Sequence, residues 1–162
     1  MISTKAYRLP NSAIGPLLGA AILRRRYFRP PIDVYWTYLA EHSVWSILYD
    51  ADGLDFVIAC LFLRDVRQID LLHSDLDGMA DSLTKRREAT HTFLVDEHRK
   101  LYLSALRNVG IEQSKWEEFC LRFFAKEGRE RPQVSELRVA LGFIVASLEQ
   151  VDESHSVLVI TG

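Results

Sequence analysis

The residues best suited to chemistry are Glu88, His91 and His98, which lie in one stretch of the chain. A Glu-x-x-His spacing places both side chains on one helix face, and carboxylate and imidazole groups are common ligands of iron, manganese and zinc. A di-metal centre in a helical bundle uses two such pairs, but the second candidate, Asp152 with His155, falls in a polar connector. A helical metal-dependent enzyme is therefore one hypothesis, and core-edge histidines bonded to neighbouring carboxylates are its alternative.

The sequence lacks the common catalytic motifs. It contains no G-x-S-x-G, no G-x-G-x-x-G, no Walker loop and no Cys-x-x-Cys. The two cysteines, Cys60 and Cys120, each lie in an apolar run, which predicts buried, reduced thiols and a cytoplasmic location. We therefore expect no cofactor, and a hydrolase or nucleotide enzyme of a common type is disfavoured.

Acidic and aromatic residues supply a second set of site candidates. The residues expected to bind a partner are Asp70, Asp75, Asp77, Asp81, Trp36 and Tyr38. The four carboxylates favour a basic partner, because opposite charges speed association. Trp and Tyr are frequent anchors of protein interfaces, although core packing is the alternative for these two aromatic residues.

Two short basic runs give a third hypothesis. They are Arg24-Arg25-Arg26 and Lys85-Arg86-Arg87, and they could contact the phosphates of a nucleic acid. Solvation and compensation of the helix dipole are the favoured explanation of such short runs. The chain has 20 Lys and Arg against 22 Asp and Glu, a net charge of −2, so it has no overall basic field and nucleic-acid binding is disfavoured. Whether the fold brings the two runs together matters more than their separate charges.

Hydrophobic periodicity predicts helices over most of the chain, and these helices must position the candidate residues. Helices are expected from Asn11 to Phe28 and over 69–83, 91–109, 114–124 and 134–148. One long bent helix over 69–109 is an alternative for the central part. The aromatic-rich stretch 32–49 also favours a helix. The apolar run 54–63 fits a buried strand or a buried helix, and Ser114 with Glu117 has the spacing of a capping box.

Together these patterns predict a mainly α protein, a compact single-domain bundle of about six helices over residues 1–162. A minor β element is expected at 54–63 and 157–160, where the second segment would pair with the first or with another chain. Residues 1–10 are expected to form an extended arm and residues 151–162 a C-terminal tail. The apolar run 13–23 is too short to span about 30 Å of bilayer, so no membrane association is expected.

The function favoured by these observations is protein binding. A composition of 48% hydrophobic and 26% charged residues is typical of a soluble globular domain. We expect a small cytoplasmic binding protein, such as a bacterial immunity or antitoxin protein or an adaptor. It would recognise its partner through an acidic and aromatic surface, and the sequence is compatible with a homodimer.

Overall fold

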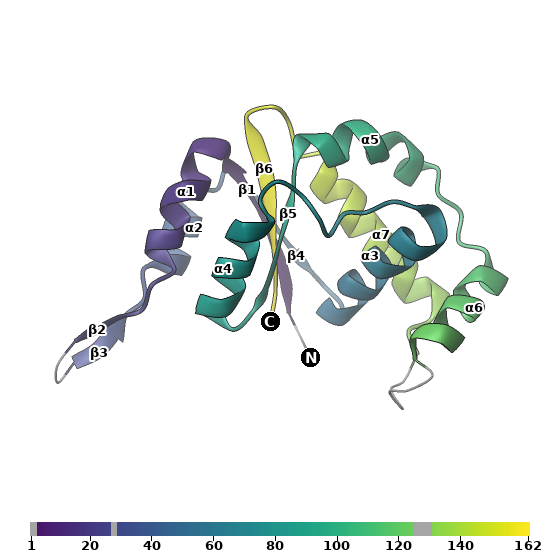
Figure 1. Ribbon diagram of the computed structural model, residues 1–162, viewed down its shortest axis with the longest axis horizontal. Helices are drawn as coiled ribbons and strands as arrows, with labels where there is room; N and C mark the ends of the chain where they lie inside the picture. Colours follow the sequence, from purple (N-terminus) through teal and green to yellow (C-terminus); the bar gives the residue numbers. More distant parts are fainter. Residues whose placement is uncertain (1–2, 27–28, 125–130) are drawn as a thin grey trace.

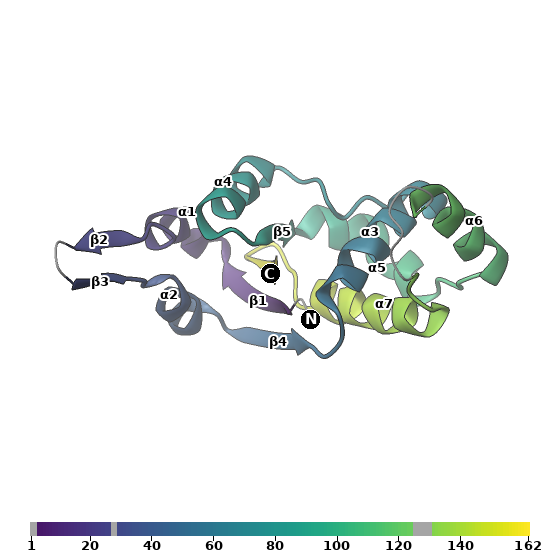
Figure 2. The ribbon, with the colours of Figure 1, turned by 90° about the horizontal axis from the view of Figure 1, so that it is seen from below.

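The computed structural model describes residues 3–26, 29–124 and 131–162, and for residues 24–26 and 29–31 it describes the backbone alone. A four-stranded antiparallel sheet runs through the middle of the molecule, and helices pack on both of its faces (Figures 1 and 2). The sheet contains β1 (Thr4–Pro10), β4 (Trp45–Tyr49), β5 (Thr90–Leu94) and β6 (His155–Thr161), in the order β4-β1-β6-β5.

Seven helices and one further strand pair lie in the described residues. The helices are α1 (Asn11–Ala20), α2 (Tyr35–His42), α3 (Gly53–Arg67), α4 (Asp77–Arg87), α5 (Asp96–Arg107), α6 (Gln113–Phe123) and α7 (Val134–Leu148). The strand pair joins β2 (Arg24–Arg26) to β3 (Arg29–Ile32), and it projects from the body of the molecule beyond α1 and α2 (Figure 1). We call this pair the basic ribbon.

The central strand β6 shows how the two cores arise. Side chains alternate between the faces of a strand, and β6 is apolar at every position from Val157 to Ile160. Val157 and Val159 face one core, whereas Leu158 and Ile160 face the other. Because all four side chains are buried, both faces of the sheet must be covered by helices.

Each face has its own layer of helices. On one face, α1, α2 and α4 bury residues such as Leu17, Leu39 and Leu83 against the sheet. On the other face, α3 and α7 pack against each other and against the sheet, and α5 and α6 complete that core. The two faces of the sheet therefore have separate hydrophobic cores.

The prediction of a mainly helical chain is confirmed, but the predicted helical bundle is wrong, because a sheet of four strands is more than a minor β element. The expected arm, residues 1–10, contains β1, and the expected tail, residues 151–162, contains β6. These two segments are the inner strands of the sheet, with Thr4 opposite Thr161. A pairing between the two ends of the chain leaves no trace in local periodicity.

The two predicted β segments have different outcomes. Residues 54–63 lie within α3, whose first turn is capped because the Asp52 carboxylate accepts the Leu54 N–H at 3.1 Å. Residues 157–160 do form a strand, but its partners are β1 and β5. The aromatic stretch 32–49 divides between helix α2 and strand β4.

Several predicted helices are shorter than expected or begin elsewhere. The first helix ends at Ala20, and Phe28 lies outside the described residues. Residues 68–76 are irregular before α4 begins, and the helix expected over 91–109 starts as strand β5 before α5. Helix α6 begins at Gln113 without a side-chain cap, so the Ser114 capping box is wrong. Helix α7 matches its prediction, and both cysteines are buried and free as predicted.

Candidate functional site

The sheet topology brings two helix starts to one end of the molecule. Strands β1 and β5 both pair antiparallel with β6, so they run parallel to each other and end at the same end of the sheet. Each leads almost directly into a helix, α1 at Asn11 and α5 at Asp96. Helix α4 also begins nearby, and its preceding residues Asp75 and Leu76 border the same space.

A pocket of about 440 Å³ lies where these three helices begin. Its lining combines apolar and acidic residues: Ile14, Leu76, Met79 and Val95 are apolar, Asp75, Asp96 and Glu97 are acidic, and Asn11, Gly15 and Ser156 complete it. We call it the acidic pocket. An apolar floor with carboxylates at its rim is suited to a Lys or Arg side chain, which lays its aliphatic stem on apolar surface and keeps its charge near solvent.

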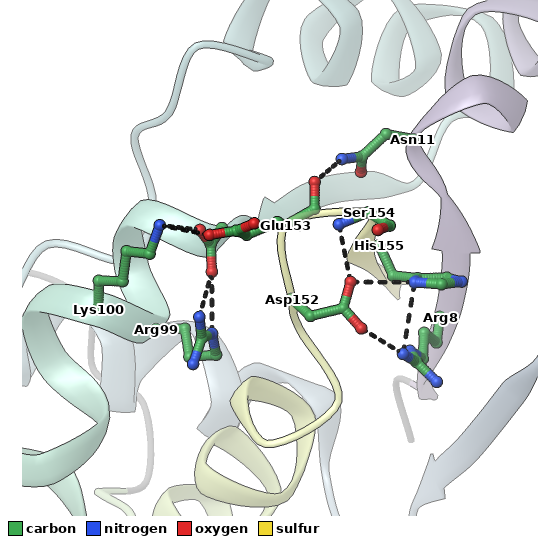
Figure 3. Close-up of polar contacts among 9 residues, drawn as sticks. Arg8, Asn11, Arg99, Lys100, Asp152, Glu153, Ser154 and His155 are labelled. Carbon is green, nitrogen blue, oxygen red and sulfur yellow. Dashed lines mark hydrogen bonds and ion pairs between the residues drawn. The ribbon is translucent and has the colours of Figure 1, made fainter.

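Asn11 is held in place by the turn that leads into β6 (Figure 3). Its side-chain amide donates to the Glu153 carbonyl at 3.1 Å, and its carbonyl oxygen accepts from the Ser156 hydroxyl at 2.8 Å. Its backbone N–H donates to the Ser154 carbonyl at 2.9 Å. These three bonds fix the wall of the acidic pocket to the central strand.

The same turn contains an ion-paired cluster of Arg8, Asp152 and His155 (Figure 3). Arg8 donates to one carboxylate oxygen of Asp152 at 2.6 Å, and the His155 imidazole bonds the other at 3.0 Å. The bonds from His155, the Ser154 N–H and Arg8 hold the pKa of Asp152 well below its usual range. Asp152 therefore stays ionised and braces the turn, and it is unsuited to proton transfer near neutral pH.

The three acidic residues of the pocket differ in their partners. Asp96 pairs with Lys100 at 2.6 Å and accepts from Arg99 at 2.7 Å, and these two bonds lower its pKa. Asp75 and Glu97 are exposed and form no ion pair with another described residue. Asp75 and Glu97 therefore provide the carboxylates that remain available to a basic ligand.

Of the predicted acidic residues, only Asp75 lines the acidic pocket. Asp77 begins α4 and accepts the Ser74 N–H at 2.8 Å, and Asp81 is exposed one turn later. Asp70 accepts from the His73 ring at 2.8 Å and from the Leu72 N–H at 3.0 Å, so it organises the irregular segment before α4.

The predicted aromatic residues lie elsewhere. Trp36 is half exposed on α2, and its ring lies 5.9 Å from the guanidinium of Arg87, at the opposite end of α4 from the acidic pocket. Tyr38 donates to the Ala13 carbonyl at 2.8 Å and stacks on His42, so it ties α2 to α1. The structure does not join the acidic and aromatic candidates into one surface.

The metal-ligand candidates do not share a helix face. Glu88 is exposed at the C-terminal cap of α4 with a φ of 55°, and His91 is buried in β5. The His91 ring bonds Tyr35 through Nε2 and the Ala89 carbonyl through Nδ1. Both ring nitrogens of His98 are likewise occupied, by the Val95 N–H and the His73 carbonyl. Within the described residues no three His, Cys, Asp or Glu side chains gather as a metal site.

The fold brings the second basic run, at the C-terminal end of α4, close to the base of the basic ribbon. Arg86 of α4 donates to the Leu18 carbonyl of α1 at 2.5 Å. Arg87 pairs at 2.5 Å with Asp33, which follows directly after β3. The basic end of α4 therefore lies at the base of the basic ribbon, where Figure 1 shows the ribbon leaving the body.

Sequence reasoning missed Asn11, Asp96 and Glu97, three residues that line the acidic pocket. A signal for them was present, because Asn11 and Asp96 are residue types found at helix starts. The signal became meaningful only with the knowledge that β1 and β5 end side by side. Neither strand was predicted.

None of the helices in the described part of the chain has both the length and the apolar character needed to cross a bilayer. Comparison of the chain with protein-family models, with curated proteins and with solved structures finds no match in any of the three.

Proposed function

We propose that the protein is a binding module that recognises a protein partner by taking one of its Lys or Arg side chains into the acidic pocket. The observation that carries this proposal is the pairing of two available carboxylates, Asp75 and Glu97, with an apolar floor that contains Ile14, Leu76 and Met79. A basic side chain would gain both electrostatic attraction and apolar contact there. Small immunity, antitoxin and adaptor proteins of the cytoplasm are the class of binding protein that we propose.

The structure changes the expected recognition surface in one respect. Trp36 and the acidic pocket lie near opposite ends of α4, so one basic side chain cannot contact both. The acidic pocket alone therefore forms the proposed recognition site. The nearby turn braced by Arg8 and Asp152 keeps its wall rigid, which reduces the entropy lost on binding.

The test is capture of partners from host lysate, with quantitative mass spectrometry of the bound proteins. The double variant Asp75→Asn with Glu97→Gln removes both available carboxylates at little change in shape. We expect the amount of the main partner captured by this variant to fall by about tenfold or more, since each lost charge contact at an interface costs on the order of 1 kcal/mol.

A matched control removes two exposed carboxylates far from the pocket, by Glu41→Gln with Glu118→Gln. This variant should retain the partner at the level of the unchanged protein. Equal retention by both double variants would contradict the proposal. Added salt should weaken the captured complex, because exposed charge contacts are screened.

The basic ribbon favours a second candidate function, binding to nucleic acid. The basic ribbon contains three arginines in β2 and one in β3. The basic end of α4, with Lys85, Arg86 and Arg87, lies near its base. A projecting two-stranded ribbon has dimensions that the DNA major groove admits, and arginines neutralise phosphates.

Fluorescence anisotropy with labelled duplex and single-stranded DNA at low salt tests this second function. The triple variant Arg24→Gln, Arg25→Gln, Arg26→Gln should lose affinity and lower the salt dependence of binding. The control Arg107→Gln, Arg122→Gln, Arg138→Gln removes equal charge from α5, α6 and α7 on the other face. Absence of binding by the unchanged protein at low salt would rule this function out.

A further inference from the structure

The two edges of the central sheet are protected differently. Edge strand β5 is buried from His91 to Leu94, helix α4 packs against it, and the His91 N–H donates to the Thr84 hydroxyl of α4 at 3.0 Å. Edge strand β4 has exposed side chains at Ser46 and Leu48, and Figure 2 shows no helix beyond it. An open edge presents unpaired backbone N–H and C=O groups that can pair with another strand.

Strand β4 also lacks the devices that usually prevent such pairing. Protected edges carry charged residues, proline or a bulge, but the segment from Val44 to Tyr49 has no charge and no proline. Its exposed positions are instead apolar, since Val44 is 58% exposed and Leu48 is 59% exposed. Natural proteins rarely leave an apolar edge of this kind uncovered.

We propose that the β4 edge pairs antiparallel with the β4 edge of a second copy of this chain. The two-fold axis would pass beside Ile47, so that Trp45 lies opposite Tyr49 of the second copy and Ser46 lies opposite Leu48. In this register a charge at position 46, 47 or 48 would lie opposite or diagonal to the same charge of the second copy. A strand without charge fits this partner.

This register also covers the exposed apolar residue of β4. Leu48 lies opposite Ser46 of the second copy and diagonal to its Leu48. Diagonal neighbours across antiparallel strands are about 7–8 Å apart, which long side chains can bridge. Each Leu48 therefore gains the Leu48 of the other copy as an apolar neighbour.

The pairing is closed. A two-fold contact uses the same surface on both copies, so the β4 edges of both central sheets are paired with each other. The outer strands of the joined eight-stranded sheet are the two β5 strands, each covered by α4. The expected assembly is a dimer and not a filament.

Sedimentation velocity over a range of concentrations tests the proposal on the full chain. The unchanged protein should sediment as a dimer. In the variant Ser46→Lys with Leu48→Lys, each lysine at position 46 would lie opposite the lysine at position 48 of the second copy. Because like charges directly opposite each other destabilise strand pairing, we expect a monomer. In the variant Ser46→Lys with Leu48→Asp opposite charges face each other, and we expect the dimer to return.

The control is Leu121→Lys on α6, because Leu121 has the same 59% exposure as Leu48. This variant should remain dimeric. A monomeric unchanged protein at every concentration, or a double-lysine variant that stays dimeric, would overturn the proposal.

Cross-linking gives an independent measurement that does not depend on the charged variants. Ile47→Cys places two thiols beside the two-fold axis, and oxidation should give a covalent dimer. Leu121→Cys should not cross-link, and the native Cys60 and Cys120 are buried and give little background. Failure of Ile47→Cys to cross-link would also count against the pairing.

Discussion

The Tyr35 hydroxyl and Nε2 of His91 lie 2.8 Å apart in the interior, although 56 positions separate the two residues along the chain. Nδ1 of His91 bonds the Ala89 carbonyl at 2.7 Å and must donate to it, so Nε2 accepts the tyrosine proton. Burial raises the pKa of Tyr35 and lowers the pKa of His91. Both groups are therefore neutral at pH 7, and their bond ties α2 to β5.

Tyr35→Phe should destabilise the protein. The substitution removes the donor and leaves a buried imidazole nitrogen without a partner, which costs about 1–3 kcal/mol. Urea unfolding at pH 8 measures the free energy of unfolding. Tyr102→Phe, at a half-buried position, is the control and should stay within about 0.5 kcal/mol of the unchanged protein. Equal effects of the two variants would show that the Tyr35 bond adds nothing.

His91 should make the stability depend on pH. Its pKa in the folded state lies below the ordinary value of 6.5, so the unfolded chain binds more protons as the pH falls through that value. The contribution of neutral His91 to the free energy of unfolding is therefore fully present above pH 6.5. It is lost as the pH falls from 6.5 through the lower pKa of the folded state. Unfolding of the unchanged protein and of His91→Asn between pH 8 and pH 5 measures this as a difference in slope. Identical slopes would contradict the prediction.

Asp55 should change the stability with pH in the opposite direction to His91. It is 8% exposed in the first turn of α3, and burial, with Glu136 and Asp52 nearby, raises its pKa to about 6. The folded state thus binds its proton more tightly than the unfolded chain, and at neutral pH the charged form destabilises the fold. Asp55→Asn should increase stability by about 1–2 kcal/mol at pH 7.5, less any loss of favourable interaction with the helix dipole.

The gain from Asp55→Asn should shrink as the pH falls from about 6 towards 4, because the carboxyl becomes protonated in the folded state and then begins to be protonated in the unfolded chain as well. Thermal unfolding at pH 7.5 and pH 4 measures this change. The exposed Asp50→Asn serves as the control and should show no such pH-dependent gain. A constant effect of Asp55→Asn at both pH values would rule out titration as its cause.

Local sequence patterns predicted helices best where one face alone is buried. Residues 116–124 and 134–148 repeat apolar positions at helical spacing, and α6 and α7 lie there. The failure at His91 has a physical reason: Thr90–Leu94 is a short strand buried on both faces, and such a strand carries no alternation. His91 and Leu94 then match a helical stripe by chance.

The rest of the fold depends on pairings between distant segments. Val157–Ile160 was recognisable as a strand, but its neighbours at Thr4–Pro10 and Thr90–Leu94 were not, because strand partners are chosen by the whole chain. The acidic pocket follows from the same pairings, so only Asp75 among its carboxylates was foreseen. The hydrogen bond from the His91 N–H of β5 to the Thr84 hydroxyl of α4 could not be predicted either, since hydroxyl residues in helices have no distinctive spacing.

Among the basic residues at the base of the basic ribbon, Arg87 should be the one whose replacement destabilises the protein most. Its guanidinium makes two bonds to Asp33, at 3.1 and 2.5 Å, and lies 4.6 Å from the centre of the Tyr35 ring. The bond from Arg87 is the main cause of the lowered pKa of Asp33. Arg87→Lys keeps the charge but loses the planar fork and the stacking, so we expect a loss of about 1–2 kcal/mol.

A double-mutant cycle separates the Arg87 pair from an ordinary surface pair. The cycle of Arg87→Lys with Asp33→Asn should give a coupling energy of about 1 kcal/mol, because the Arg87 side chain is only 10% exposed. The parallel cycle of Arg99→Lys with Asp96→Asn should give a smaller coupling energy, since that pair is more exposed on the arginine side and lies within one helix turn. Urea unfolding at pH 7.5 measures both. Equal coupling energies would mean that the Arg87 bridge at the base of the basic ribbon contributes no more than a solvated ion pair.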